Sequence, residues 1–255
     1  MPHFDRGVEL CKPGPQADVR RPQLKFPRCE TRSAPPSEFD WIMPRAEDFN
    51  GISLPWFFLR FKFSLATPFA SKDDRDPGSE TNLVVREWVF QRPIIRPTTW
   101  KGRLKFAADE AETDEDDVNW LFGKPGDQGM EGRLHFFPTV FDSDARDDKQ
   151  ILNPHDRGTR HANRHLVNIG VVPAGAGGVF AVLYVGTSDA DVARNAPLIC
   201  GWLPPLLTQY GIGARTLKGD GLCSNRITEL QVWPKSFEPG NDIKDIWDLK
   251  VKVPG

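Results

Sequence analysis

The sequence predicts an α+β fold of the ferredoxin-like type, an antiparallel sheet with helices on one face. Residues 56–66 alternate apolar and polar side chains as a half-buried strand does, residues 98–112 and 189–209 have helical patterns, and strand-like segments flank each helix. The resulting order, βαβ…ββαβ, suits antiparallel strands covered on one face by helices, and the ferredoxin-like arrangement is the commonest of that kind. The chain has 255 residues, 39% of them hydrophobic, which is enough for a large domain with a substantial core.

The first elements are a strand, a short second strand and a helix. The apolar face of the strand at 56–66 consists of Phe57, Leu59, Phe61, Phe63 and Leu65, and its other face of Arg60, Lys62 and Ser64. A second strand is predicted over residues 83–90, after a polar loop. The helix at 98–112 should be capped by Thr98 or Thr99. Its inward face should consist of Leu104, Ala107, Ala108 and Ala111.

The later elements continue the alternation. A strand is predicted over residues 133–141, and a β-hairpin over 166–186, where apolar residues alternate on both sides of a glycine-rich centre. Residues 166–188 carry no charge, but their central Pro173–Gly178 opposes a helix, so no membrane span is predicted. The helix at 189–209 should be interrupted by Pro197, Pro204 and Pro205. A final strand is predicted over residues 226–233, and residues 248–253 are a candidate to join it.

Charge and cysteine usage limit the class of protein. The formal net charge of −2 and the isoelectric point near 6.2 exclude a wholly basic nucleic-acid coat protein, so any RNA affinity must come from a local patch. The cysteines stand singly and residues 1–14 lack the apolar core of a signal peptide, so the cytoplasm is the expected location. Zinc held by Cys11, Cys29 and His3 is one interpretation, but the spacing fits no known finger, and buried or incidental thiols are the ordinary one.

A glycine-rich loop over residues 211–221 is the main candidate binding element. Its glycines, Gly211, Gly213, Gly219 and Gly221, permit positive φ angles and a close approach of backbone amides to a ligand. Its other candidate residues are Ala214, Arg215, Thr216 and Lys218. Such a loop can hold a phosphate chain through N–H groups and cations without reading bases. It is neither a Walker loop nor a dinucleotide-binding loop, because no GK[ST] ends it and Thr216 replaces the third glycine. A tight turn without a ligand is the alternative.

Two further segments carry clustered cations. Lys101, Arg103 and Lys105 lie near the start of the helix at 98–112, where a bound phosphate would explain cations that the helix dipole otherwise disfavours. A solvated basic face is the alternative. The polar segment at 153–165 contains Arg157, Arg160 and Arg164 together with His155, His161 and His165. Because the arginines would repel a metal ion, contact with RNA or a partner is expected there rather than metal binding.

These segments, in this order, resemble the RAMP superfamily, the backbone subunits of type III CRISPR effectors. The matching motifs are Pro97-Thr-Thr-Trp-Lys-Gly-Arg-Leu-Lys105, Leu121-Phe-Gly123, Gly132-Arg-Leu-His-Phe136 with Asp142, Asn153-Pro-His155, and Gly211-Ile-Gly-Ala-Arg-Thr216 with Gly219 and Gly221. The resemblance spans about residues 56–233, and the glycine loop is its most specific part. The Asn-Pro-His segment and the sequence of the loop are most similar to those of Cmr-type members that cap one end of the filament.

The resemblance implies a RAMP fold with a ferredoxin-like, RRM-like core that packs beside other Cas subunits. It implies that the chain holds guide RNA, with target RNA paired to it, for antiviral defence, and that base pairing supplies the specificity. No cofactor would be required and no membrane is involved. A ferredoxin-like interaction subunit that makes no direct RNA contact is the alternative.

Some members of this family cut target RNA with an aspartate in the loop after the first strand, using a divalent metal. The corresponding loop here offers Asp73, Asp74, Asp76 and Glu80, oxygen ligands of the kind that Mg²⁺ prefers. However, the expected aspartate position falls at Thr81, so a solvated loop without catalysis is the expectation. The acidic group of Asp142, Asp144, Asp147 and Asp148 is interpreted as a charged surface loop. A guide-processing ribonuclease with His155 or His161 as base lacks a paired acid.

Residues 1–50 differ in composition from residues 51–255 and are predicted to form a proline-rich basic N-terminal arm preceding the RAMP domain. The residues that define it are Pro2, Pro13, Pro15, Pro22, Pro27, Pro35, Pro36 and Pro44, with Arg20, Arg21, Lys25, Arg28 and Arg32. Either the arm is a flexible lead segment or it becomes ordered on a neighbouring subunit or on RNA. Its apolar residues, Phe26, Phe39, Trp41 and Ile42, favour ordering on assembly.

Overall fold

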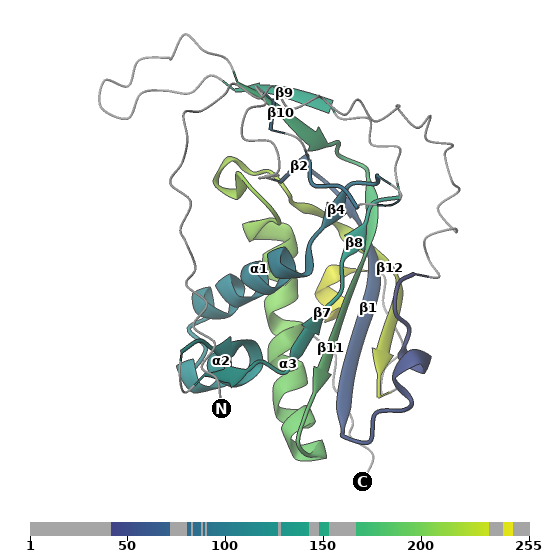
Figure 1. Ribbon diagram of the computed structural model, residues 1–255, viewed down its shortest axis with the longest axis vertical. Coiled ribbons are helices and arrows are strands. Elements are labelled where there is room, and N and C mark those ends of the chain that lie inside the picture. Colours follow the sequence, from purple (N-terminus) through teal and green to yellow (C-terminus); the bar gives the residue numbers. More distant parts are fainter. Residues whose placement is uncertain are drawn as a thin grey trace, which may run out of the picture. The chain divides into compact units, whose positions relative to one another are not determined.

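The computed structural model describes residues 42–71, 81–82, 84–87, 89, 91–126, 129–142, 148–152, 167–234 and 242–246. Most of the predicted N-terminal arm and the predicted additional strand at 248–253 lie outside these residues. The described part contains a main sheet, a second smaller sheet and helices (Figure 1).

Four strands form the main sheet: β1 (Trp56–Leu65), β7 (Leu134–Phe136), β11 (Gly177–Val185) and β12 (Cys223–Trp233). Their order across the sheet is β12-β1-β11-β7, and neighbouring strands are antiparallel. If these four strands are numbered 1 to 4 in chain order, their order across the sheet is 4-1-3-2. Helices α1 (Pro97–Glu110) and α3 (Asp189–Pro205) lie in the connections before β7 and before β12. This is the βαββαβ arrangement of the ferredoxin-like fold, so the predicted fold class is confirmed.

One face of the main sheet packs against the helices. In Figure 1, α1, α3 and the short α2 (Glu115–Phe122) lie on the same side of β1 and β11. The apolar face predicted for the first strand is buried in this core, and the core residues of the helices include Trp100 and Leu104 of α1 and Ile199 and Leu203 of α3. The indole N–H of Trp100 donates to the hydroxyl of Thr139 at 3.0 Å, and this hydroxyl donates to the carbonyl of Val179 at 2.6 Å. A buried polar chain thus fixes α1 against β11.

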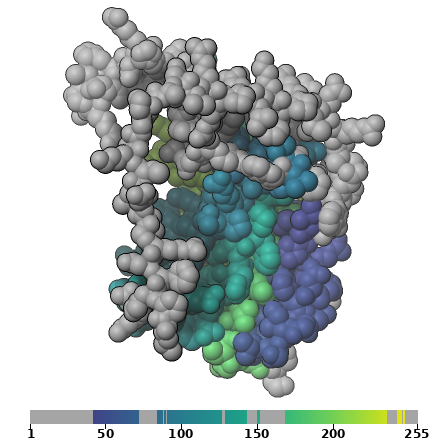
Figure 2. All heavy atoms as spheres, viewed as in Figure 1, coloured from purple at the N-terminus to yellow at the C-terminus, as the bar shows by residue number. Residues whose placement is uncertain are grey.

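The opposite face of the main sheet is partly covered by the segment that precedes β1. The 3₁₀ turn η2 (Ala46–Phe49) places Phe49 on Phe58, with ring centroids 5.1 Å apart, and Met43 is also buried there. Trp56 stacks on Trp233 at 5.4 Å in the same cluster. Figure 2 shows residues 42–65, in purple and blue, as a continuous surface beside the teal and green strands. Residues 42–50, which the composition assigned to the N-terminal arm, therefore pack on the main sheet.

A second sheet lies beside the end of β1. Its strands are β2 (Phe69–Ala70), β3 (Thr81–Asn82), β9 (Asp148–Leu152) and β10 (Val167–Val172). The predicted hairpin at 166–186 is wrong in its pairing, because β10 pairs with β2, β3 and β9 while β11 pairs with β1 and β7. The connection between β10 and β11 bonds to β1 instead: Gly175 N–H donates to the Leu65 carbonyl at 2.8 Å, and Leu65 N–H donates to Ala176 at 2.9 Å.

The predicted strands at 83–90 and 133–141 also need correction. In the described part of the first segment, Arg86 forms only an isolated antiparallel bridge with Pro93, beside the bonds of Glu87 N–H to the Arg92 carbonyl and of Ile94 N–H to the Val85 carbonyl. The next strand, β4 (Ile94–Ile95), pairs with β8 (Thr139–Val140). The second segment is divided into β7 and β8 around Pro138, which has no N–H for a sheet ladder. The short strands β5 (Gly123–Lys124) and β6 (Met130–Glu131) form a separate pair.

The helices differ from prediction at their ends. Helix α1 begins at Pro97, which needs no N–H partner in the first turn, and its N-cap Arg96 makes no side-chain cap, so the predicted threonine caps are wrong. Ala111 is exposed because it follows the last helical residue. Helix α3 continues through Pro197 and passes into the π-helical turn η3 (Leu206–Tyr210). No helix in the described ranges is long and apolar enough to span a membrane.

Candidate nucleic-acid interface

The glycine loop, residues 211–221, connects η3 to the strand β12. The predicted positive φ angles are present, with values of 72° at Gly211, 83° at Gly213, 84° at Gly219 and 78° at Gly221. A Cβ atom at Gly221 would collide with the Ile212 carbonyl oxygen, and one at Gly213 with that of Ala70. These glycines therefore allow the loop backbone to pack closely against itself and against β2.

The backbone amides of the loop are largely bonded within the protein. Gly211 N–H donates to the Leu206 carbonyl at 2.8 Å, Ile212 N–H to Gly221 at 2.9 Å, Ala214 N–H to Ala70 at 2.8 Å, Lys218 N–H to Arg215 at 2.8 Å, Gly219 N–H to Thr216 at 2.9 Å and Gly221 N–H to Pro68 at 2.8 Å. These six amides are not offered to a phosphate chain, and RNA binding by the loop stays a prediction. The bonds instead make the loop a rigid support for its side chains.

Arg215 is held in place by two neighbours. Its guanidinium lies 2.6 Å from the Gln150 amide oxygen of β9 and 3.1 Å from the Asp220 carboxylate. Arg215 itself has a left-handed backbone, with φ 63°, and its side chain is 24% exposed. Since Asp220 offsets its charge, Arg215 contributes less to an anion site than an unpaired cation would.

The tip of the loop is the 3₁₀ turn η4 (Thr216–Lys218), and it projects from the surface. Leu217 is fully exposed and Lys218 is exposed. Among the residues that the structure describes, Lys218 has no ion-pair partner, so its ammonium group keeps its full charge toward solvent. Of the predicted loop cations, Lys218 is the better placed to meet a polyanion.

Arg103 joins the basic helix start to the glycine loop. Its Nε donates to the Gly211 carbonyl at 2.9 Å and its Nη2 to the Tyr210 carbonyl at 2.8 Å, while its guanidinium lies 4.6 Å from the centre of the Phe106 ring. Burial lowers the pKa of Arg103, although a guanidinium stays protonated at neutral pH. Arg103 thus caps the carbonyl end of η3. Lys101 is exposed and Lys105 half-buried on the same helix.

The remaining predicted site residues lie outside the described residues: Asp73, Asp74, Asp76, Glu80, Arg157, Arg160, His161 and Arg164, as do Cys11 and Cys29. The described ends of two of these segments nevertheless meet the glycine loop. Ala70, which lies shortly before the acidic segment, forms a β-bridge with Ala214 of the loop. Gln150 of β9, the strand that precedes residues 153–166, accepts a hydrogen bond from Arg215.

In the described ranges, no group of three histidine, cysteine or acidic side chains could hold a metal ion. Cys200 and Cys223 are buried, and burial raises the pKa of both thiols.

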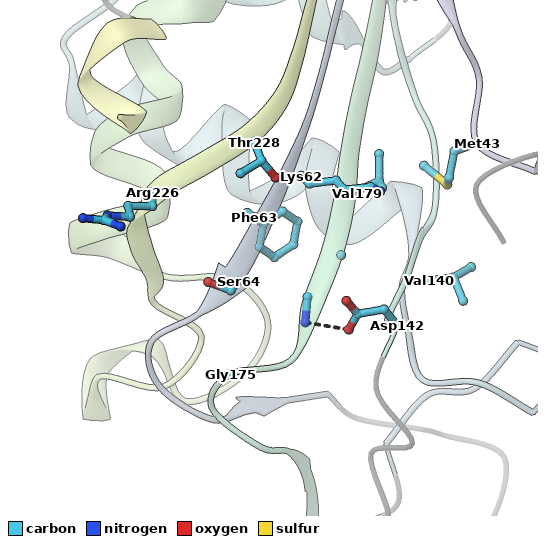
Figure 3. A pocket seen from close by; sticks show the side chains of 12 residues that line it. Met43, Lys62, Phe63, Ser64, Val140, Asp142, Gly175, Val179, Arg226 and Thr228 are labelled. Carbon is cyan, nitrogen blue, oxygen red and sulfur yellow. Dashed lines mark hydrogen bonds between the residues drawn. The ribbon is translucent and has the colours of Figure 1, made fainter. Parts of the chain in front are cut away.

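A second polar surface was not among the predicted site residues. A cavity of about 290 Å³ opens on the same main-sheet face as η2, in the part that η2 leaves uncovered, and Lys62, Ser64, Asp142, Arg226 and Thr228 are among its lining residues (Figure 3). The sequence does contain a signal for it. Lys62 and Ser64 of β1 and Arg226 and Thr228 of β12 alternate with core residues, as polar residues on an uncovered sheet face do.

Comparison with known proteins identifies the family. The chain matches the model of the RAMP superfamily over residues 62–224. No curated protein matches it in sequence. Its fold is similar to a chain in the cryo-EM structure of the type III-B Cmr-beta bound to cognate target RNA, with a TM-score of 0.56 and 17% sequence identity. The similarity covers 77% of this chain and 65% of that chain, less than two thirds of its length. From the matched residues and the shared fold, this chain belongs to the RAMP superfamily.

Proposed function

We propose that this chain is a structural, RNA-binding subunit of a type III CRISPR effector complex, which holds the backbone of guide RNA and of the guide–target duplex for antiviral defence. Its partners would be guide RNA, target RNA and other Cas subunits, and its location the cytoplasm. The observation that carries the proposal is the rigid glycine loop, which presents Lys218 at its tip beside the described ends of two other polar segments.

The geometry favours contacts to phosphate over contacts to bases. Because six of the loop amides, including those of Lys218 and Gly219, are bonded internally, side-chain cations would supply most of the attraction, which is independent of sequence. A loop already fixed in one conformation loses little entropy on binding. The chain as a whole carries a net charge of −2, so the attraction must be local.

Salt-dependent RNA binding tests the proposal. The double variant K101A/K218A removes two exposed cations, while K124A/K244A removes two exposed lysines of β5 and η5 (Ile243–Ile246) and is the matched control. For single-stranded RNA, each lost phosphate contact lowers the slope of log affinity against log salt by about 0.7. We expect a decrease of about 1.4 in K101A/K218A and none in the control.

Two results would contradict this function. If the slope of log affinity against log salt were equal in K101A/K218A, the control and the unmodified chain, Lys101 and Lys218 would not contact RNA. If the full chain showed no RNA binding at low salt, the interaction-subunit alternative would be favoured. The ratio of absorbance at 260 and 280 nm of the purified assembly gives an independent measure of bound nucleic acid.

Metal-dependent cleavage of target RNA is a second candidate. It is favoured by the start of the acidic segment at Ser71, directly after the residue that bridges to the glycine loop. Mg²⁺ would then be held by some of Asp73, Asp74, Asp76 and Glu80. The assembled complex is incubated with complementary RNA and Mg²⁺; cleavage that persists after alanine replaces all four residues excludes this segment from the chemistry.

A further inference from the structure

The cavity on the main sheet is built from groups of opposite charge on opposite sides. Across the sheet, Arg226 belongs to β12, Lys62 and Ser64 to β1, and Gly177 to β11, so the cations lie toward one edge. On the other side, the Asp142 carboxylate accepts a 2.8 Å hydrogen bond from Gly177 N–H (Figure 3). The distance from β12 to β11 is two strand spacings, roughly 10 Å.

The neutral lining of the cavity combines hydroxyl groups with an apolar wall. Ser64 Oγ and Ser224 Oγ are 2.8 Å apart, and Thr228 lies on the same strand as Ser224. Val179 and Met43 supply the apolar surface of the lining. The absence of a side chain at Gly177 is required, because a Cβ atom there would collide with the Asp142 carboxylate.

We propose that this cavity receives one nucleotide of a single-stranded RNA, at a site separate from the glycine loop. A nucleotide has the same polarity as the cavity: an anionic phosphate at one end, a ribose with hydroxyl groups, and a planar base whose edge carries hydrogen-bond donors. The phosphate lies toward Arg226, the ribose toward the serine and threonine hydroxyls, and the base edge toward Asp142. Lys62 borders the phosphate end, but its ammonium group already pairs with the Glu229 carboxylate at 2.7 Å, so Arg226 is the main cation there. The inference rests on the proposed RNA-binding function.

The arrangement also predicts a base preference. The aromatic side chains on this sheet face, Trp56, Phe58 and Trp233, lie in the cluster with Phe49 and Met43, so hydrogen bonds rather than aromatic stacking select the base. A carboxylate accepts from an exocyclic amino group, as from N4 of cytosine. Uracil has no amino group, and its N3–H donor lies between two carbonyl oxygens that the carboxylate would repel, so the site favours cytosine.

Two oligonucleotides and four variants of the full chain test the proposal. The probes are 12-nucleotide oligocytidine and oligouridine, and the variants are T228W, which fills the cavity, N225W, its control on the same strand, D142N, and K218E in the glycine loop. Thr228 and Asn225 are both exposed, so neither tryptophan must enter the core. Thermal unfolding of each variant confirms that it is folded.

We expect the unmodified chain and N225W to bind oligocytidine about fivefold more tightly than oligouridine, a ratio typical of one ordinary hydrogen bond, because the Asp142 carboxylate is exposed to water. T228W and D142N should lower the ratio toward one. K218E should weaken binding of both oligonucleotides and leave the ratio unchanged.

Equal affinities in T228W and N225W, with K218E still weakened, would overturn the cavity site and leave the proposed function standing. T228W that blocks subunit assembly but not RNA binding would show a protein occupant and also overturn it. No binding by any form would overturn the proposed function itself.

Discussion

Replacing Arg103 with alanine should destabilise the fold, because this residue supports the glycine loop from beneath. The change removes two hydrogen bonds from a guanidinium to the carbonyls of Gly211 and Tyr210, at 2.9 Å and 2.8 Å, and a contact with the Phe106 ring. A hydrogen bond to a charged group contributes about 1.5–3 kcal/mol when buried. Because Arg103 is only half-buried, we expect a total loss of about 2–3 kcal/mol.

Urea unfolding of Arg103→Ala measures this loss directly, and the melting temperature should fall by roughly 4–12 °C. Lys101→Ala, two residues earlier on the same helix and exposed, is the matched control and should stay within about 0.5 kcal/mol of the unmodified chain. Equal stabilities of the two variants would refute the supporting role. Arg103→Lys should recover only part of the loss, since an ammonium group cannot bond both carbonyls in the same fork geometry.

Three further predictions follow from the backbone and the buried groups. Gly219→Ala should cost about 1–2 kcal/mol for its left-handed backbone alone, whereas Gly221→Ala should cost more than about 3 kcal/mol because its Cβ also meets the Ile212 carbonyl; equal urea midpoints would contradict this. Burial raises the pKa of Tyr184 to about 12, so the unfolded chain ionises first and the free energy of unfolding should fall as pH rises from about 10 to 12, less steeply in Tyr184→Phe. Cys200 and Cys223 should resist iodoacetamide at pH 8 in the native chain and react in urea, which mass spectrometry of peptides would show.

The fold could be predicted because its strongest local patterns coincide with its core. The alternation of residues 57–65 identified the buried face of β1, and the uncharged strand pattern of residues 177–185 identified β11. The pairing of β10 could not be predicted, because alternation shows that a segment is a strand and does not show which strand bonds to it. Pro197 predicted a break, but helix packing in the core overrode its local cost.

The backbone of the glycine loop was predictable from the sequence, whereas the hydrogen-bond partners around it were not. The spacing of glycines at 211, 213, 219 and 221 indicated positive φ angles, which the structure has. The same spacing carried no information on the partners of the loop amides, which include the distant carbonyls of Pro68 and Ala70. Arg103 was predicted as a phosphate ligand from its charge, yet its position in the second turn of α1 directs it to the end of η3. Charge alone does not distinguish a supporting arginine from a binding one.

The packing of Phe49 and Met43 on the main sheet has a practical consequence for expression. A shortened chain that starts at Gly51, where the composition changes, would uncover Phe58, Trp56 and Trp233 together. A contiguous aromatic area of this kind on a soluble protein promotes aggregation. Truncations meant to remove the proline-rich residues should therefore end before Ile42, and poor solubility of a chain beginning at residue 51 would be a packing defect rather than a sign that the removed residues bind a partner.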